Sequence, residues 1–201
     1  YLDDIKITNY NPLISSVVTN LNLTLAQEGF YNSVLNRLNM KDTVTVYLKN
    51  NTPPFANVDS ARGVIDSLTF TGNFGFRNAP SGNYYIVVKH RNCIETWSKS
   101  GGEVYTFGGV INYDFTTANT QAFGNNMKQV DNSPVKYGIY SGDVDQNKVI
   151  DLTDVIQINN AANAFTTGYV VTDVNGDNLT DLSDLIFANN NSADFVAVVA
   201  P

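Results

Sequence analysis

The chain has 201 residues, of which 43% are hydrophobic and 11% aromatic, a composition typical of a folded globular protein rather than a disordered one. A net charge of −7 without a basic run argues against nucleic-acid binding, and no stretch approaches the roughly 20 apolar residues of a membrane span. Cys93 is the only cysteine, which excludes an internal disulfide and a cysteine-based zinc site.

Residues 1–15 are expected to be the end strand of an upstream module followed by a linker. The chain starts Tyr1-Leu2-Asp3-Asp4, without the basic start and apolar run of a signal peptide. We therefore expect that a signal was removed or that the chain is part of a longer protein. Residues 1–7 alternate apolar and polar side chains like a strand. They resemble the last strand of jelly-roll carbohydrate-binding modules, with an ordinary edge strand as the alternative.

Residues 16–118 are predicted to form a β-sandwich. Short apolar or alternating runs lie around residues 21–25, 44–48, 70–76, 84–88 and 111–115, with turn-forming residues between them. Roughly six or seven short strands at this spacing are typical of an immunoglobulin-like sandwich. The run FGFRNAPSGNYYIVV, from Phe74 to Val88, resembles the paired strands of transthyretin-like, carboxypeptidase-regulatory-like sandwiches. That resemblance implies a fold and carries no active site with it.

The segment KHRNCIETW, residues 89–97, contains the side chains most suggestive of catalysis. Cys93 and His90 could form a nucleophile and base. His90 is the sole histidine, however, and no helix start or glycine-rich turn follows that could form an oxyanion hole. A loop rim with incidental polar residues is therefore expected, and no enzyme activity. Trp97 could stack on a sugar ring or fill the end of the sandwich, and the sequence leaves both open.

Residues 119–140 are polar and rich in Asn, Gln and Gly, and are expected to be a connector. Tyr137, Ile139 and Tyr140 are apolar enough to fix the end of this connector onto one of the two domains.

Residues 141–201 contain an internal repeat with an offset of thirty residues. The run from Asp143 to Asp154 matches the run from Asp173 to Asp184, and Phe165 matches Phe195. This region holds nine acids and one base, Lys148, so it carries all the excess negative charge of the chain. The acids alternate with apolar residues at fixed spacing, unlike those of an acidic tail.

Each copy places oxygen-bearing side chains at positions 1, 3, 5, 9 and 12 of a twelve-residue loop, the spacing with which a loop wraps Ca²⁺. Position 7 offers its backbone carbonyl. Position 8, Ile150 and Thr180, is expected to form a short strand pairing between the loops. Two calcium ions are predicted, with the ligands Asp143, Asp145, Asn147, Val149, Asp151 and Asp154 in the first loop and Asp173, Asn175, Asp177, Leu179, Asp181 and Asp184 in the second.

The Gly-Asp start, the two loops and a helical pattern after each resemble a type I dockerin over residues 141–201. The resemblance implies two F-hands, each a loop with an exiting helix, that bind a cohesin domain of another protein. It also implies an immunoglobulin-like X module before the dockerin. Position 6 departs from the usual glycine: Lys148 and Asn178 stand there and are expected to adopt positive φ.

Positions 10 and 11, where the family often carries a Ser-Thr pair that contacts cohesin, are Leu152-Thr153 and Leu182-Ser183. These four residues are therefore the predicted partner-binding residues, with a more apolar surface than is usual. An apolar stripe follows in each helix, Leu152, Val155 and Ile156 in the first and Leu182, Leu185 and Ile186 in the second. The stripes are expected to pack on each other as a core, and part of them could serve a partner. The pairs Asn159-Asn160 and Asn189-Asn190 are expected to end the helices.

The expected protein is thus a mainly β sandwich followed by a small helical, dockerin-like calcium-binding domain. The expected function is attachment, without catalysis, of a larger secreted bacterial protein to a cohesin-like scaffold or the cell surface, plausibly in polysaccharide degradation. Two alternatives stay open. The sandwich could bind carbohydrate while the calcium loops are structural, or the unit could be a cell-surface structural or sorting element.

Overall fold

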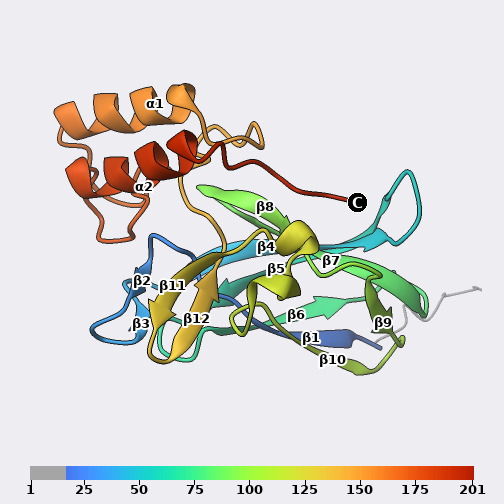
Figure 1. The fold of residues 1–201 in the computed structure, drawn as a ribbon. Coiled ribbons are helices and arrows are strands. Elements are labelled where there is room, and N and C mark those ends of the chain that lie inside the picture. The colour runs from blue at the N-terminus through green and yellow to red at the C-terminus, as the bar shows by residue number, and fades with distance from the viewer. Residues whose placement is uncertain (1–16) are drawn as a thin grey trace, which may run out of the picture.

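The computed structural model describes residues 17–201 (Figure 1). The strand and linker expected within residues 1–15 lie outside the described residues. The first part of the fold consists of strands β1 (Thr19–Thr24), β2 (Tyr31–Asn32), β3 (Arg37–Leu38), β4 (Asp42–Asn50), β5 (Asn57–Ile65), β6 (Thr71–Phe76), β7 (Gly82–His90), β8 (Cys93–Trp97), β9 (Glu103–Tyr105) and β10 (Val110–Asp114).

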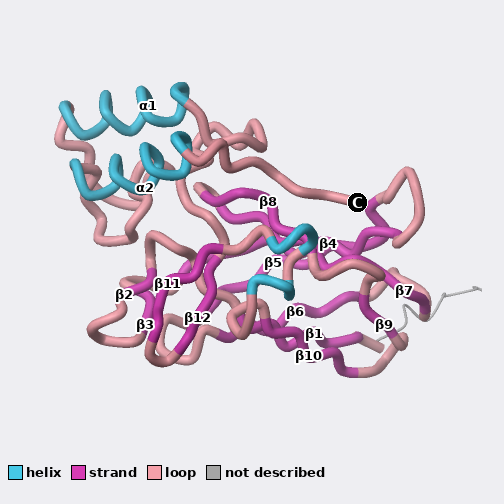
Figure 2. The backbone as a smooth tube through the Cα atoms, in the orientation of Figure 1, coloured by secondary structure: helices cyan, strands magenta, loops and turns pink. Residues whose placement is uncertain are grey.

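Two sheets form the predicted β-sandwich (Figure 2). The smaller sheet has the order β10-β1-β6, with β1 parallel to β10 and antiparallel to β6. The larger sheet has the order β5-β4-β7-β8, and β9 also pairs with β7. Alternation fixes the faces: Val44, Val46 and Leu48 of β4 point into the core that they share with Leu21 and Leu23 of β1. Each fully buried side chain of this kind stabilises the fold by about 1.5–3 kcal/mol.

Strands β5 and β8 do not correspond to the expected runs. β5 is a polar edge strand whose buried Asp59 accepts hydrogen bonds from the backbone amides of Asn78 and Ala79. β8 replaces the loop rim expected at residues 89–97, and that expectation is wrong. Every residue of β8 is buried because Cys93 belongs to the sandwich core while Ile94 packs against the C-terminal region.

The segment expected as a connector, residues 119–140, has structure of its own. It contains two 3-10 turns, Asn119–Gln121 and Phe123–Asn125, and the hairpin of β11 (Lys128–Asn132) and β12 (Val135–Gly138). Met127 and Ile139 are buried in the sandwich core. The segment therefore packs onto the sandwich at both places.

Helices α1 (Leu152–Asn163) and α2 (Leu182–Ala193) lie side by side beyond the end of β8 (Figure 1). A small second core joins them to the sandwich through Ile94 of β8, and its members from the repeat are Val144, Ile150, Ile158, Val174, Ala188 and Val196. After α2 the chain returns over the larger sheet, where Val198 packs against the cluster of Tyr85, Val87 and Trp97. Neither helix, nor any other within residues 17–201, has the length and apolar character to cross a membrane.

Candidate metal centre and its surroundings

The two copies of the repeat have matching backbone geometry. At loop position 6, Lys148 has φ +81° and Asn178 has φ +70°, which confirms the expectation of positive φ at both residues. At position 4, Gln146 has φ +60° and Gly176 has φ +76°. Left-handed residues thus recur at the same positions, so both loops follow the same path.

Positions 9 and 12 of each loop form a capping box at the start of the helix. Asp151 accepts a hydrogen bond from the amide of Thr153 at 2.7 Å, and Asp154 accepts from the amides of Asp151 at 3.0 Å and Val144 at 2.8 Å. Asp181 and Asp184 make the equivalent bonds in the second copy. The carboxylate at position 12 therefore ties the helix to the start of its own loop. The spacing Asp-x-x-Asp before an apolar run was the sequence signal for this cap.

Position 8 does not pair between the loops, and the expected pairing of Ile150 with Thr180 is wrong. The amide of Ile150 donates to the carbonyl of Val196 at 2.8 Å, and the amide of Thr180 donates to the carbonyl of Thr166 at 2.8 Å. Each loop therefore pairs with the segment that follows the helix of the other copy. The two loops do not pair with each other because the backbone amides of Ile150 and Thr180 are already bonded to the segments that follow α2 and α1.

This pairing directs the carbonyl of position 7 into each loop. Val149 lies opposite Ala197 in an antiparallel bridge. The two hydrogen bonds of this bridge are made by the neighbours of Val149: the carbonyl of Lys148 accepts from Val198, and the amide of Ile150 donates to Val196. In an extended strand the amide and carbonyl of one residue point to the same side. The amide of Val149 donates to Asn147 Oδ1 at 2.9 Å inside the loop, so its carbonyl faces the loop as well. Leu179 makes the matching bond to Asp177 Oδ1 at 2.9 Å.

The first loop gathers three carboxylates. Ligand atoms of Asp143, Asp145 and Asp154 lie within 4.8 Å of one another, the one such group of acids, histidines or cysteines among residues 17–201. Asp143 Oδ1 is buried and accepts no hydrogen bond. Burial and the neighbouring Asp154 raise the pKa of Asp143 to about 7. A buried acceptor without a partner, beside two further carboxylates, fits a hard cation such as Ca²⁺.

The second loop is arranged differently. Asp173 and Asp184 are fully buried, and burial raises the pKa of both. Asp173 Oδ1 accepts from the amides of Gly176 at 2.8 Å and Asp177 at 3.1 Å. The acids Asp173, Asp177, Asp181 and Asp184 do not form a second group as close as that of the first loop. Position 3 is an amide here, and the side-chain nitrogen of Asn175 donates to Ser183 Oγ at 2.7 Å.

The sandwich contacts the second loop through Arg91 and Asn92, which were expected in a loop rim, and through Asn39. Arg91 Nη2 lies 3.4 Å from Asp173 Oδ2, and the Arg91 Nη1 donates to the carbonyl of Val170. The side-chain amide of Asn92 donates to the carbonyl of Asp173 at 2.8 Å, and that of Asn39 donates to the carbonyl of Asn175 at 2.9 Å. No local pattern could reveal these partners, because they are 79 or more residues apart in the chain.

A buried polar network anchors Arg91 to the sandwich. Asp42 accepts hydrogen bonds from Arg91 Nε at 2.9 Å and from the hydroxyl of Tyr169, and its Oδ2 lies 3.0 Å from His90 Nε2. Burial alone would raise the pKa of Asp42, but the bonds from His90, Tyr169 and Arg91 outweigh it and hold that pKa well below the usual range. His90 therefore has a structural place in this network.

Cys93 and Trp97, the other notable residues of the expected loop rim, are both buried, and Cys93 Sγ lies 3.2 Å from His90 Nδ1. Cys93 is fully buried, and burial raises the pKa of its thiol. Trp97 is 5% exposed, and its indole nitrogen donates to Glu95 Oε1 at 2.8 Å. Phe55 and Tyr85 meet its ring edge to face. Trp97 therefore fills an aromatic cluster on the outer face of the larger sheet.

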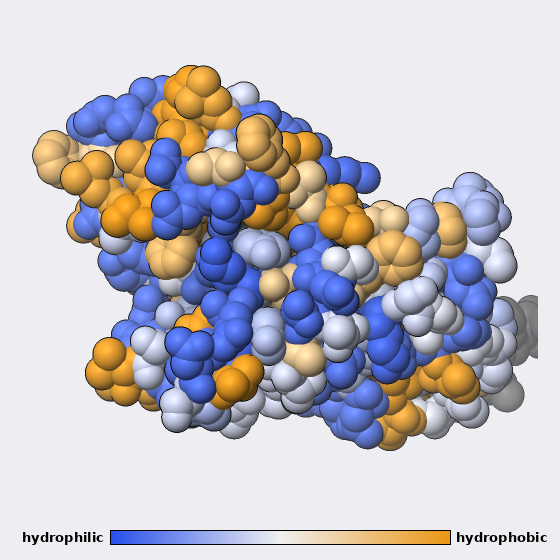
Figure 3. Space-filling model, in the orientation of Figure 1, coloured by the Kyte–Doolittle hydropathy of each residue, from blue (hydrophilic) through white to orange (hydrophobic). Residues whose placement is uncertain are grey.

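The apolar stripes of the helices form the core only in part: Val155 and Leu185 are half-buried and pack against it, whereas the other stripe residues are exposed. Leu152 and Leu182 are 65% and 69% exposed, and Ile156 and Ile186 are also exposed. The fully buried apolar side chains that the two helices contribute to this core are Ile158 and Ala188. Of the other predicted partner residues, Thr153 is exposed and Ser183 is half-buried. The hydropathy surface shows apolar side chains spread over the helical region (Figure 3).

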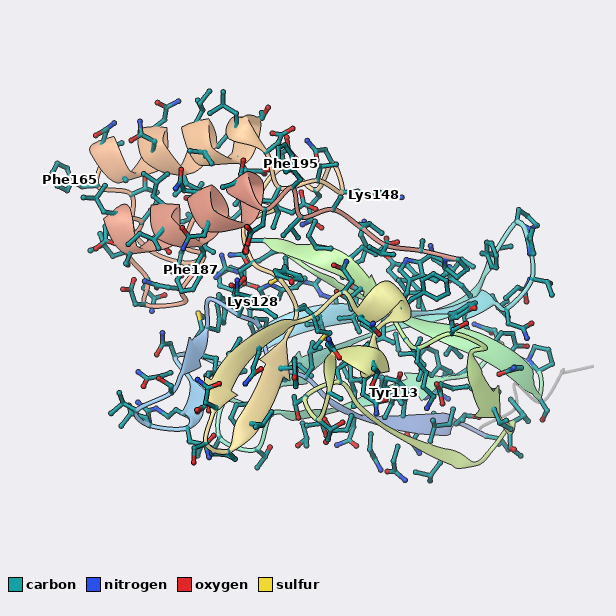
Figure 4. The ribbon with its side chains drawn as sticks, viewed as in Figure 1. Tyr113, Lys128, Lys148, Phe165, Phe187 and Phe195 are labelled. Carbon is teal, nitrogen blue, oxygen red and sulfur yellow. The ribbon has the colours of Figure 1, made fainter. Side chains whose placement is uncertain are left out.

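The helices also run past the Asn-Asn pairs that were expected to end them, to Asn163 and Ala193. Each ends in a Schellman turn: the amide of Thr166 donates to the carbonyl of Ala161 at 3.0 Å, with Phe165 left-handed at φ +51°. Phe195 has φ +53° in the second copy. Phe165 and Phe195 lie at opposite ends of the helix pair (Figure 4). A groove of about 520 Å³ joins Phe165 to Leu179 and Leu182.

Comparison with known proteins gives a likeness of fold. No protein-family model and no curated protein match the chain. A chain from the crystal structure of a C-terminal interface mutant of a type II cohesin–X–dockerin complex from Acetivibrio cellulolyticus matches with a TM-score of 0.52 and 17% identity, over 88% of this chain and 99% of that chain. A chain from an N-terminal interface mutant of the same complex gives a TM-score of 0.45 and 16% identity, over 89% and 99%. At this identity the first likeness concerns the fold, and the β-sandwich agrees with it.

Proposed function

We propose that the chain is a non-catalytic, calcium-dependent attachment module. In this proposal residues 141–201 are a dockerin-like unit that binds a cohesin-type scaffold protein, and the immunoglobulin-like or transthyretin-like sandwich before them is a supporting module. The proposed setting is a secreted bacterial protein attached to a scaffold or cell surface, plausibly one that degrades polysaccharide.

The observation that carries the proposal is the pair Phe165 and Phe195, which are 80% and 87% exposed. Both have left-handed backbone, a conformation that costs a non-glycine residue about 1–2 kcal/mol. Neither the exposed ring nor the strained backbone helps the chain to fold, yet both recur at the same place in the two copies. Aromatic side chains, phenylalanine included, are enriched in protein–protein interfaces relative to the rest of the surface.

The surroundings of the rings support the same partner class. Phe165 lies beside Leu179 and Leu182 in the groove of about 520 Å³. The residues equivalent to these two leucines in the other copy are Val149 and Leu152, both of which are exposed. The hydroxyl residues Thr153 and Ser183 follow Leu152 and Leu182 directly. A partner that fits this surface presents apolar pockets with hydroxyl-binding groups beside them. Nine acids against one base in residues 141–201 favour a partner with basic side chains at its rim.

Calcium has a structural role in the proposal. Bound in the two loops, it would fix the start of α1 and α2, because Asp154 and Asp184 both cap a helix and close a loop. The proposed ligands in each loop are the side chains at positions 1, 3, 5, 9 and 12 and the carbonyl at position 7. The orphaned Asp143 Oδ1 supports this assignment for the first loop.

The fold likeness adds support of a different kind. The match covers 88% of the chain, which is more than the share formed by the 140 residues that precede the repeat. The matching structure is a cohesin–X–dockerin complex by its description. A sandwich that packs directly onto a loop-helix unit suits an X module with its dockerin.

The carbohydrate-binding alternative loses its clearest candidate, because Trp97 is 5% exposed and covered by Phe55 and Tyr85. A cell-surface structural or sorting element remains the second proposal, since it too would use an exposed apolar surface.

The test is calcium-dependent binding to immobilised type II cohesin, measured by surface plasmon resonance. We expect Phe165→Ser or Phe195→Ser to weaken binding at least tenfold, and the pair together to weaken it further. Val34→Ser is the matched control, because Val34 is a 91% exposed apolar residue in the β2–β3 turn of the sandwich. Equal binding by all variants would contradict the proposed surface, and no binding to any cohesin would contradict the proposed partner class.

A further inference from the structure

A further concave site lies at the junction between the sandwich and the repeat. It is a cavity of about 220 Å³ on the outer face of the larger sheet, and its lining residues are Thr43, Thr45, Arg62, Lys89, His90, Arg91, Gln146 and Tyr169. Three of these carry a permanent positive charge and none is an acid. This is unexpected in a chain whose net charge is −7.

Strand register explains how the charges come together. Thr45 of β4 pairs with Arg62 of β5 on one side and with Lys89 of β7 on the other. Directly opposed residues of antiparallel strands share a face, with Cβ atoms about 4.5–5.5 Å apart. Arg62 and Lys89 therefore flank the hydroxyl of Thr45 in one row across three strands, and both long side chains can reach a group placed above it.

Two of the three positively charged side chains have a carboxylate partner, and the third, Arg62, has none within the described part of the chain. Arg91 Nε is paired with Asp42 at 2.9 Å, and Lys89 Nζ lies 3.8 Å from Glu95. Within residues 17–201 the guanidinium of Arg62 makes neither a hydrogen bond nor an ion pair. Like charges placed side by side on a sheet repel each other, so this row favours an anion between them.

The repeat closes the open side of the cavity. Tyr169, from the segment between α1 and the second loop, packs against Arg91 with the guanidinium carbon 4.5 Å from the ring centre. Gln146, at position 4 of the first loop, lines the same side, and its side-chain nitrogen donates to the carbonyls of Cys93 and Asp143. The site thus has a floor from the sandwich and a wall from the repeat, and it exists only while the two are docked.

We propose that this cavity binds an oxyanion group, the carboxylate or sulfate of a small acidic ligand. The planar guanidinium of Arg62 matches such an oxyanion with paired hydrogen bonds, whereas Arg91 already uses its nitrogens on Asp42, Val170 and Asp173 and contributes only its charge. Lys89 adds a charge and Thr45 a hydroxyl. Free sulfate and a sugar acid share this chemistry. The cavity is smaller than the roughly 300–1,000 Å³ of drug-sized ligand sites, so it suits a single charged group or one acidic sugar residue.

The experiment is an NMR titration of the ¹⁵N-labelled full chain in calcium buffer, with sodium sulfate in one arm and sodium galacturonate in the other. Sodium chloride at equal ionic strength is the reference. We expect saturable shifts at the amides of Thr45, Arg62 and Lys89 in at least one arm. Saturation by sulfate alone identifies an inorganic anion site, and tighter saturation by galacturonate identifies a sugar-acid site.

Arg62→Gln is expected to weaken that binding about tenfold, which corresponds to about 1.4 kcal/mol. Arg37→Gln is the control, because it removes the same charge from an exposed arginine of β3 and is expected to change the affinity less than twofold. Shifts that match those in chloride, or an equal affinity in the two variants, would overturn the proposal. Both results are independent of the proposed cohesin binding, because none of the residues that line this cavity belongs to the partner surface proposed above.

Discussion

The two loops differ in burial at positions 3 and 4: Asp145 is exposed and Gln146 half-buried in the first loop, whereas Asn175 and Gly176 are buried in the second. The backbone is the same in both, with matching capping boxes and matching left-handed residues. The difference comes from a neighbour: Arg91, Asn92 and Asn39 contact the second loop. A repeat can thus keep its internal geometry while its two copies acquire different environments, and these copies are expected to respond differently to mutation and pH.

Removal of calcium is expected to have the largest effect on both copies. A ligand at 100 times its dissociation constant stabilises the native state by about 2.7 kcal/mol per site. Two loops together are therefore expected to contribute about 5 kcal/mol at that saturation. Calorimetric melts in calcium and in chelator should differ by several degrees. Identical melts would contradict calcium binding by either loop.

Arg91→Gln is expected to break the ion pairs with Asp42 and Asp173, and the pair with Asp173 is a contact between the sandwich and the second loop. The Arg91 side chain is 10% exposed, and those of Asp42 and Asp173 are 1% and 0% exposed. Removing one partner of a buried pair costs about 3 kcal/mol or more, because the other charge stays buried and unpaired. Urea unfolding in calcium measures this loss. Lys99→Gln, which breaks the pair with Glu103, is the control, because these side chains are 48% and 18% exposed and the loss is expected to be about 1 kcal/mol or less. Equal losses in both variants would contradict the anchoring role of Arg91.

The pH dependence of the metal-free chain should identify the first loop. The pKa of Asp143 rises from 3.8 to about 7 on folding, so the native state binds its proton more tightly than the unfolded state does. Its contribution to stability is therefore lost as pH rises from about 4 to 7, by about 1–3 kcal/mol. In chelator we expect the chain to melt at a higher temperature at pH 5 than at pH 8.

Calcium should reverse that trend, because protons compete with the ion for Asp143 and its neighbours. Asp143→Asn should reduce the pH dependence seen in chelator. A metal-free chain that gains stability between pH 5 and pH 8 would contradict the arrangement of the three carboxylates.

The smallest effect concerns position 6. A non-glycine residue at positive φ is strained by about 1–2 kcal/mol, and the greater freedom of unfolded glycine offsets part of any relief. Lys148→Gly is expected to raise the free energy of unfolding by about 0.5–1 kcal/mol, and Asn178→Gly by less because asparagine tolerates this region. Urea unfolding of both variants measures the difference. A larger gain from Asn178→Gly would show that backbone strain does not distinguish the loops.

The sequence supported accurate predictions wherever the controlling interaction is local. Alternation located β1, β4 and β10, a continuous apolar run located β7, and loop spacing predicted the positive φ of Lys148 and Asn178. Contacts across the chain were not predictable. β8 has a mixed polar and apolar sequence, and its residues are buried because the sandwich covers one side of the strand and the repeat covers the other. The helix ends were missed because Phe165 and Phe195 occupy a backbone position that glycine or asparagine usually fills.

Titration calorimetry of the chelator-treated full chain with calcium tests the central claim most directly. The account predicts two ions per chain, one ion after either Asp143→Ala or Asp173→Ala, and the same loss for Asp184→Ala as for Asp173→Ala. No heat of binding, or two unchanged sites in these variants, would contradict it.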